Sequence, residues 1–203
     1  RDDILDITDF DVVIWIKSEM RLMLNEEIAR AILIGDGRSA GDEDRINPEK
    51  IRPIATDDDL FVTTINLNLN DANSSAEEII DAAIRHRRYY KGTGKPDFYT
   101  SDDVLSDMLL IKDGMGRRIY NSIEDLKSAL RVEDIVPVEL FSTVPDLVGI
   151  YVNLTDYAVG TDKGGEVSMF DDFDIDFNKY KYLIETRLSG CLTKAKSALV
   201  FRK

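Results

Sequence analysis

Residues 11–37 read DVVIWIKSEMRLMLNEEIARAILIGDG, and this stretch predicts one long amphipathic helix that stops at a Gly-Asp-Gly turn. At about 1.5 Å per residue, a helix from Asp11 to Ile34 would be roughly 35 Å long, against an average of about 11 residues. A compact enzyme rarely needs such a helix. Gly35 can take the left-handed conformation that ends a helix. Apolar side chains recur at steps of three and four, which keeps them on one helix face: Val13, Ile16, Met20, Met23, Leu24, Ile28 and Ala31.

The apolar stripe of this helix is wider than one buried face requires. Ile14, Trp15, Leu22 and Leu33 extend it well beyond the usual arc of about 100°. We therefore expect the helix to pack on more than one side.

The charge of the chain excludes one class of function. It has 203 residues, with 39 acidic and 26 basic side chains and a formal charge of −13. A broad grip on phosphate backbones needs clustered Lys and Arg, so a nucleic-acid reader is not expected. The run Arg85-His86-Arg87-Arg88 is interpreted as a match to the negative end of a helix dipole.

Hydropathy and the number of cysteines limit the cellular compartments that are expected for the protein. No stretch approaches 18 consecutive apolar residues, and no signal peptide is recognisable, so no membrane association is expected. Cys191 is the single cysteine, which makes a reducing cytoplasm the default compartment. Because the sequence begins with Arg1, we expect it to be a fragment or processed product.

After the long helix, predicted strands and helices alternate up to about residue 130, and the rest of the chain is predicted to be mostly strands. A helix over 74–88 begins with the capping box of Ser74 and Glu77, Ser101 caps a second helix and Ser122 a third that runs to about Leu130. Gly164-Gly165 is a hairpin signal. This order predicts an α+β protein in two lobes, with the middle of the chain inserted. Strands are predicted over 60–69, 98–100, 135–141, 149–154, 157–160, 166–170 and 198–201, with an alternating segment from Phe173 to Leu188.

The chain has few side chains that suit catalysis. His86 is the single histidine, so a Ser-His-Asp or Cys-His triad and a zinc site are not expected. Asp171, Asp172, Asp174 and Asp176 form an acidic cluster that alternates with apolar residues. We interpret it as a strand with one solvated face, and a divalent-metal site of a metal-dependent hydrolase is the alternative.

Four motifs, in order, resemble a known family. The helix ends with the Gly-Asp-Gly turn Gly35-Asp36-Gly37, residues 110–120 read LIKDGMGRRIY, and 135–138 read IVPV. Asn178, Glu185-Thr186-Arg187 and the apolar run 198–201 then follow. This order is similar to the Hong Kong 97 fold of the major capsid proteins of tailed bacteriophages, which encapsulin nanocompartments share.

The resemblance implies a division of the chain and a set of structural residues. A peripheral domain would hold the spine helix (1–36) and antiparallel strands (147–193), around an inserted axial α/β domain (37–146), with the C-terminal strand (194–203) returning to the axial domain. The resemblance further implies a truncated subunit, without the family's N-terminal arm and extended loop. No catalytic, cofactor-binding or metal-binding residue is expected. A minor alternative is an isopeptide cross-link between Asn178 and a Lys of the extended loop, promoted by Glu185 as base. The structural residues would be Gly35, Asp36, Gly37, Glu185 and Arg187.

The implied function is a structural, non-enzymatic one. The chain would be a subunit of a phage or prophage capsid that self-assembles, as pentamers and hexamers, into an icosahedral shell enclosing DNA without sequence-specific binding. Scaffold, portal and maturation protease would be further partners, and the shell would form in the bacterial cytoplasm and become part of the virion. An encapsulin-like nanocompartment shell is the alternative. We expect this chain alone to be monomeric or weakly associated, and Ile14, Trp15 and Leu22 to be partly exposed in it.

Overall fold

The computed structural model describes residues 2–39, 41–43, 45–67, 75–144, 146–162 and 167–203, and of residues 2–11 and 75 only the backbone. The chain forms two units. The first contains Arg1–Ile51 and Val159–Gly190, and the second contains Arg52–Ala158 and Cys191–Lys203. Ser74, Gly164 and Gly165 lie outside the described residues, so their predicted roles stay predictions.

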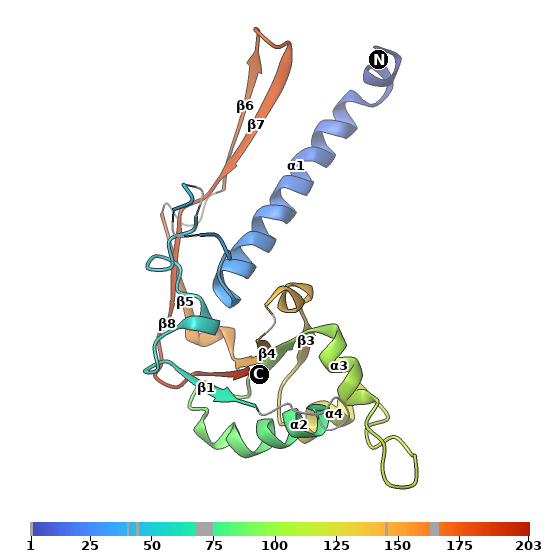
Figure 1. The fold of residues 1–203 in the computed structure, drawn as a ribbon. Helices are drawn as coiled ribbons and strands as arrows, with labels where there is room; N and C mark the ends of the chain where they lie inside the picture. Colours follow the sequence, from blue (N-terminus) through green and yellow to red (C-terminus); the bar gives the residue numbers. More distant parts are fainter. Residues whose placement is uncertain (1, 40, 44, 68–74, 145, 163–166) are drawn as a thin grey trace. The chain divides into compact units, whose positions relative to one another are not determined.

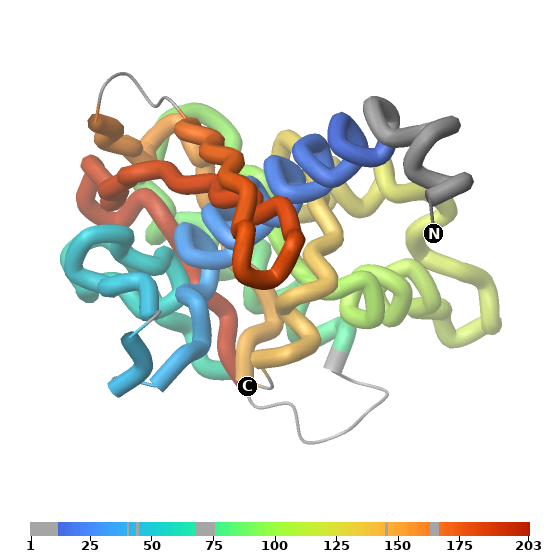
Figure 2. The backbone as a smooth tube through the Cα atoms, turned by 90° about the horizontal axis from the view of Figure 1, so that it is seen from above, coloured from blue at the N-terminus to red at the C-terminus, as the bar shows by residue number. Residues whose placement is uncertain are grey.

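The first unit consists of a long helix and a β-hairpin. Helix α1 (Asp2–Leu33) has 32 residues. It begins nine residues before the predicted start, because no Gly or Pro in that stretch stops a helix. Strands β6 (Ser168–Asp174) and β7 (Lys179–Glu185) pair antiparallel, and Figures 1 and 2 show this hairpin alongside α1.

The hairpin corrects the prediction of one alternating segment from Phe173 to Leu188. The chain reverses between β6 and β7, so Asp174 ends a strand and Asp176 lies in the turn. Asn178 takes a left-handed backbone with φ of 50°, a conformation that Asn tolerates better than most residues. The alternation of acidic and apolar residues here therefore does not mark a single strand with one solvated face.

The second unit is built on a five-stranded mixed sheet with the order β1-β9-β4-β2-β3. The outer pairs, β1 with β9 and β2 with β3, are parallel, whereas β4 is antiparallel to both β9 and β2. The five strands are β1 (Val62–Asn66), β2 (Asp97–Thr100), β3 (Ile135–Pro137), β4 (Leu147–Val152) and β9 (Ala198–Arg202).

Three helices pack on this sheet through their apolar faces. They are α2 (Ser75–His86), α3 (Asp102–Leu109) and α4 (Ile123–Leu130). The predicted N-caps of α3 and α4 are confirmed. The Ser101 hydroxyl accepts a hydrogen bond from the Val104 amide, and the Ser122 hydroxyl accepts one from the Asp125 amide. At the centre of the core, the rings of Phe98, Tyr151 and Phe201 meet edge to face, with centroids 4.7 and 5.2 Å from Tyr151.

Strand β4 also corrects the predicted grouping of elements. The sequence assigned 147–193 to the antiparallel strands of the other lobe, yet β4 is the central strand of the second unit's sheet. Its six residues are all buried, because both sheet faces are covered there. The chain therefore changes unit after Ile51, Ala158 and Gly190, and not after 36, 146 and 193.

Short elements complete the fold. The predicted strand 135–141 stops at Pro137, which cannot donate a ladder hydrogen bond, and continues as a 3-10 turn. Strands β5 (Tyr157–Thr161) and β8 (Leu188–Leu192) form a two-stranded sheet where the chain passes between the units. The 3-10 turns are η1 (Ile54–Thr56), η2 (Arg87–Tyr89), η3 (Glu139–Thr143) and η4 (Leu154–Asp156).

The core of the second unit predicts the effect of one glycine substitution. A Cβ at Gly149 would clash with the Phe98 ring and lie 3.0 Å from the Tyr99 carbonyl oxygen. We expect Gly149→Ala to lower the free energy of unfolding by about 2–3 kcal/mol, since overpacking a core forces neighbours to shift. Urea denaturation followed by circular dichroism measures this loss. Gly114→Ala is the matched control, because no atom lies within 4 Å of a Cβ there, and an equal loss in both variants would contradict the account.

Candidate assembly surface

The Gly-Asp-Gly turn ends α1 as the sequence predicts. The Arg30 carbonyl oxygen accepts hydrogen bonds from the amides of Ile34 and Gly35, at 2.9 and 3.0 Å. Gly35 and Gly37 have φ of 89° and 71°, both in the left-handed region that favours glycine. The turn therefore needs glycine at both positions.

Asp36 holds the loop that follows the turn. Its side chain is buried, and its carboxylate accepts the amides of Arg38 at 3.1 Å and of Ile46 at 2.6 Å. Burial alone would raise the pKa of Asp36, but these two backbone hydrogen bonds outweigh it and hold that pKa below its usual value. The positive charges of Arg38 and Arg45 act in the same direction.

The other sequence-predicted site residues lie apart from one another. Asn178 precedes β7 and Glu185 ends it, so the two are roughly 20 Å apart at about 3.3 Å per residue. They do not form one site within the chain. Glu185 ends β7 and Arg187 lies in the link to β8, and among the described residues no ion pair joins the two.

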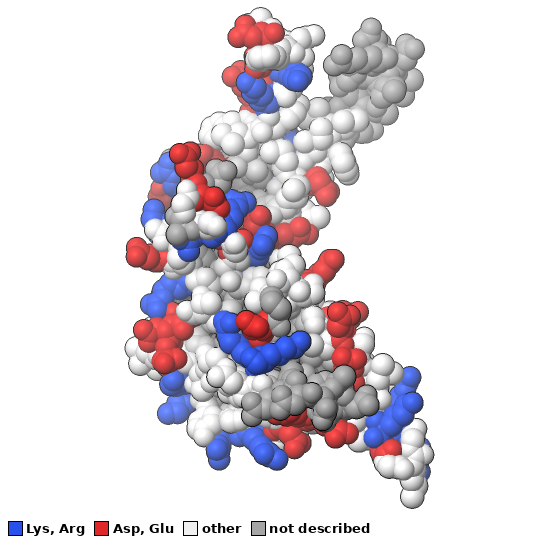
Figure 3. Space-filling view, viewed as in Figure 1, with Lys and Arg blue, Asp and Glu red and all other residues white. Residues whose placement is uncertain are grey.

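Helix α1 has two apolar faces, and the described residues of the chain cover only one of them. Of the predicted inward face, Ala31 is buried and Val13, Ile16, Met20, Leu24 and Ile28 are half-buried, whereas Met23 is 60% exposed. The expectation that Ile14, Trp15 and Leu22 are partly exposed is confirmed, with 50, 62 and 52% of their surfaces accessible. Figure 3 shows few charged side chains on α1 in this view.

The β6–β7 hairpin also carries apolar side chains on both faces. Lys17 of α1 pairs with Asp171 at 3.5 Å and lies over the Tyr182 ring, so the face with Asp171 and Tyr182 is turned to α1. Phe170 lies opposite Leu183 on the other face, and these side chains are 53 and 56% exposed. The sequence signal for this second face is the adjacent apolar pairs at 169–170 and 183–184.

The first unit as a whole has almost no core. Among its described residues, the buried apolar side chains are those of Ala31, Leu33 and Ile51. Many large exposed apolar side chains on a few elements are typical of an interaction site, whereas isolated exposed residues are not. The large apolar side chains that it exposes are Val12, Ile14, Trp15, Leu22, Met23, Val159, Val167, Phe170, Phe173, Ile175, Phe177, Tyr180 and Leu183.

The second unit exposes apolar residues at the loop between α3 and α4. In this loop, which projects in Figure 1, Met115 is 80% exposed and Leu110 and Ile119 about half. The Asp113 carboxylate accepts the amides of Met115 and Arg117, both at 2.9 Å, which fixes the tip. The sequence motif at 110–120 thus forms a defined projection.

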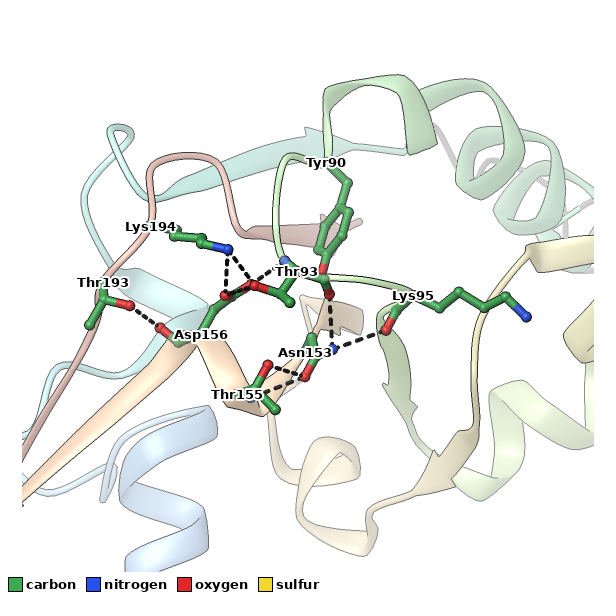
Figure 4. Close-up of polar contacts among 8 residues, drawn as sticks. All are labelled: Tyr90, Thr93, Lys95, Asn153, Thr155, Asp156, Thr193 and Lys194. Atoms are coloured by element: carbon green, nitrogen blue, oxygen red, sulfur yellow. Dashed lines mark hydrogen bonds and ion pairs between the residues drawn. The ribbon is translucent and has the colours of Figure 1, made fainter.

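The polar cluster around Asp156 is a structural tie (Figure 4). Asp156 is buried and accepts hydrogen bonds from the Thr93 amide and hydroxyl, and Lys194 is 3.4 Å from its carboxylate. Burial opposes the charge of Asp156, but the Thr93 and Lys194 contacts hold its pKa below the usual value. The Thr193 hydroxyl donates to the Asp156 carbonyl at 2.9 Å. Three segments far apart in sequence meet here, which no local pattern could predict.

The acidic residues of the hairpin do not gather as metal ligands. Asp171 and Asp172 point to opposite faces of β6, and Asp174 pairs with Lys181. Over the described ranges of the chain, no three His, Cys, Asp or Glu side chains are placed to hold a metal ion. The hydrolase alternative therefore lacks its ligand set. In the same ranges, no helix is long and apolar enough to cross a membrane.

Comparison with known proteins identifies the fold. No protein-family model matches the chain, and no curated protein matches its sequence. It is similar to the capsid of an empty GTA particle, with a TM-score of 0.62 and 13% identity over 98% of this chain and 67% of the other. The fold is a capsid-protein fold. A structure of Mycobacterium phage Bobi has a TM-score of 0.59 and 10% identity, with 98% of this chain and 67% of that chain covered.

A third similar structure comes from a cellular organism. A virus-like particle from Pyrococcus furiosus has a TM-score of 0.50 and 13% identity, with 69% of this chain and 56% of that chain covered. The chain spans about two thirds of the first two chains and 56% of the third.

The Asp36 contacts predict a pH-dependent contribution to stability. Asp36→Asn keeps the shape but removes the charge, and we expect it to cost about 1–2 kcal/mol near neutral pH. Because the pKa of Asp36 is lowered, its contribution is present above its unfolded pKa and is lost as pH falls through its folded pKa. Urea unfolding should therefore show a difference between variant and native chain that shrinks below about pH 4. A difference that grows on acidification would contradict this.

The two hairpin faces predict opposite outcomes for substitutions. Replacing Phe170 and Leu183 by Thr on the bare face should leave the melting temperature within about 2 °C, because little buried surface is lost. If the bare face is an assembly surface, the same change in the complete natural gene product should abolish its self-association in sedimentation velocity. Met169→Thr with Ile184→Thr, on the face toward α1, is the matched control and should lower the melting temperature. Equal destabilisation by both pairs would show that the outer face is not a free surface.

Proposed function

We propose that this protein is a structural, non-enzymatic subunit of an icosahedral phage or prophage capsid with the Hong Kong 97 fold. The observation that carries the proposal is the first unit, whose helix and hairpin keep large apolar side chains in solvent. Neighbouring copies would cover these surfaces. The likeness to the capsid of an empty GTA particle supports this reading.

The two units would have different roles in the shell. The first unit, with α1 as a stiff strut, would be the peripheral domain that contacts adjacent subunits along their edges. The second unit, with its closed core and projecting 110–119 loop, would be the axial domain that gathers around five-fold and six-fold axes. Pentamers and hexamers are then the units of self-association.

The charge of the chain suits a wall around nucleic acid. A formal charge of −13 disfavours a strong grip on phosphate, so the shell would enclose DNA without sequence-specific binding. Scaffold, portal and maturation protease are proposed partners during assembly in the bacterial cytoplasm. The assembled product would be part of the virion.

A nanocompartment shell is the second candidate function. The observation that favours it is the likeness to the virus-like particle from Pyrococcus furiosus, because that particle comes from a cellular organism. Its TM-score is lower than those of the GTA and phage structures. The gene neighbourhood discriminates the two: portal and protease genes support the capsid, and a gene for a cargo enzyme supports the nanocompartment.

Assembly of the complete natural gene product tests the proposal. We expect closed particles by negative-stain electron microscopy and a fast-sedimenting species in sedimentation velocity. Dissolved in denaturant, these particles should run at the mass of single chains, because Asn178 and Glu185 are too far apart in one chain to form a cross-linking site. A gene product that stays monomeric under all assembly conditions would overturn the proposal.

A further inference from the structure

A basic cleft opens on the second unit beside the C-terminal ends of α2 and α4. Its volume is about 870 Å³. It concentrates positive charge on a chain whose formal charge is −13. Five basic side chains and two acidic ones line it: Arg87, Arg88, Lys95, Lys127, Arg131, Glu124 and Glu133.

The two lysines of the cleft have acidic partners within the chain. Lys127 pairs with Glu124 at 2.9 Å and with Asp134 at 2.8 Å. Lys95 lies 3.8 Å from Glu133. The acidic side chains of the cleft are thus already engaged by its lysines.

The three arginines have no such partners. Across the described parts of the chain, Arg87, Arg88 and Arg131 form no ion pair. The guanidinium groups of Arg87 and Arg88 lie over the rings of Tyr90 and Tyr89, at 4.5 and 4.8 Å from the centroids. Among the described residues, the buried Nε of Arg87 has no hydrogen-bond acceptor. Stacking holds two of these groups in place without neutralising their charge.

Helix dipoles account for only part of this charge. Each helix C-terminus offers about half a negative charge, so α2 and α4 together offer about one. Three guanidinium groups therefore leave the cleft with an excess of positive charge. Arginine in such a setting binds carboxylates or phosphates through paired, parallel hydrogen bonds.

The same unit carries a complementary acidic surface on α3. Asp102, Asp103 and Asp107 are exposed, and no ion pair of the described residues includes them. Asp103 and Asp107 are four residues apart on a helix, where like charges repel. Some acidic residues elsewhere pair with basic ones of the same chain: Asp57 with Arg52, Asp171 with Lys17 and Asp174 with Lys181.

The cleft and the acidic surface lie on different sides of the unit. Figure 1 draws α3 at the right of the second unit and the C-terminal end of α2, one wall of the cleft, at its left. A chain therefore cannot fill its own cleft with its own α3. Two complementary surfaces on different sides of one subunit are the arrangement that joins copies head to tail into a ring.

We propose that the cleft formed by Arg87, Arg88 and Arg131 binds the acidic face of α3 from a second copy of this chain. This inference rests on the proposed function, since it specifies how neighbouring axial domains of one capsomer recognise each other. The pairing sets the direction of the ring, because each copy presents the cleft on one side and α3 on the other. It also makes ring formation sensitive to salt, since exposed charges are screened within about 10 Å at 0.1 M ionic strength.

Charge reversal in the complete gene product tests the pairing. Arg88→Glu and, separately, Asp107→Lys should each raise the protein concentration needed for assembly by about tenfold. A chain that carries both substitutions should assemble as the native protein does, because each interface then regains opposite charges. Light scattering against concentration measures the threshold, and thermal unfolding shows that each variant folds. Arg88→Gln and Asp107→Asn give milder losses if a reversal disturbs folding.

Arg85→Glu is the matched control. It makes the same change of charge three residues earlier, in α2, but Arg85 pairs with Asp81 outside the cleft, so assembly should be unchanged. The inference would be overturned if both single-reversal variants assembled like the native protein, or if the double variant did not recover assembly. The capsid proposal would stand in either case. Loss of binding to duplex DNA in Arg88→Glu without any loss of assembly would assign the cleft to nucleic acid and overturn it too. A native protein that never assembles would instead refute the proposed function.

Discussion

The constraint on which this structure depends is that its first unit cannot bury its own apolar side chains. A single helix and a two-stranded hairpin offer two faces each, and they can cover only the pair that meets. Lys17 and Asp171 mark that meeting, and Trp15 on α1 and Phe170 on the hairpin lie in solvent. Because apolar surface in water is unfavourable, the other two faces require a partner. The proposed self-association would follow from how the chain is divided, and the capsid-protein fold is consistent with it.

The second unit has the opposite character. A mixed sheet with β4 at its centre, three helices and an aromatic cluster give it a closed core of its own. The Asp156 tie fixes loops that arrive from three parts of the chain. Its exposed features are a charged cleft and a projecting loop. A protomer with one closed unit and one open unit can combine apolar burial along its edges with directional charge pairing around an axis.

Local signals in the sequence predicted local structure well. Ser101 and Ser122 cap helices as expected, and Gly35 ends α1. The wide apolar stripe of α1 indicated that Trp15 would be exposed in this chain. Features that depend on distant partners were not predictable. The alternation around Asp174 reads equally as one strand or as two strands of a hairpin, and only the reversal at Asn178 decides. The central place of β4 depends on β2 and β9, about 50 residues away on either side, a pairing that no local period specifies.

The fluorescence of Trp15 tests the central claim most directly, because it is the single tryptophan of these 203 residues and lies on the bare face of α1. Any tryptophan outside them would first be replaced by Phe in the complete gene product. We predict red-shifted, acrylamide-quenchable emission from the free subunit, and blue-shifted, protected emission from the assembled particle. Emission that is already protected in the monomer, or that does not change on assembly, would contradict the account.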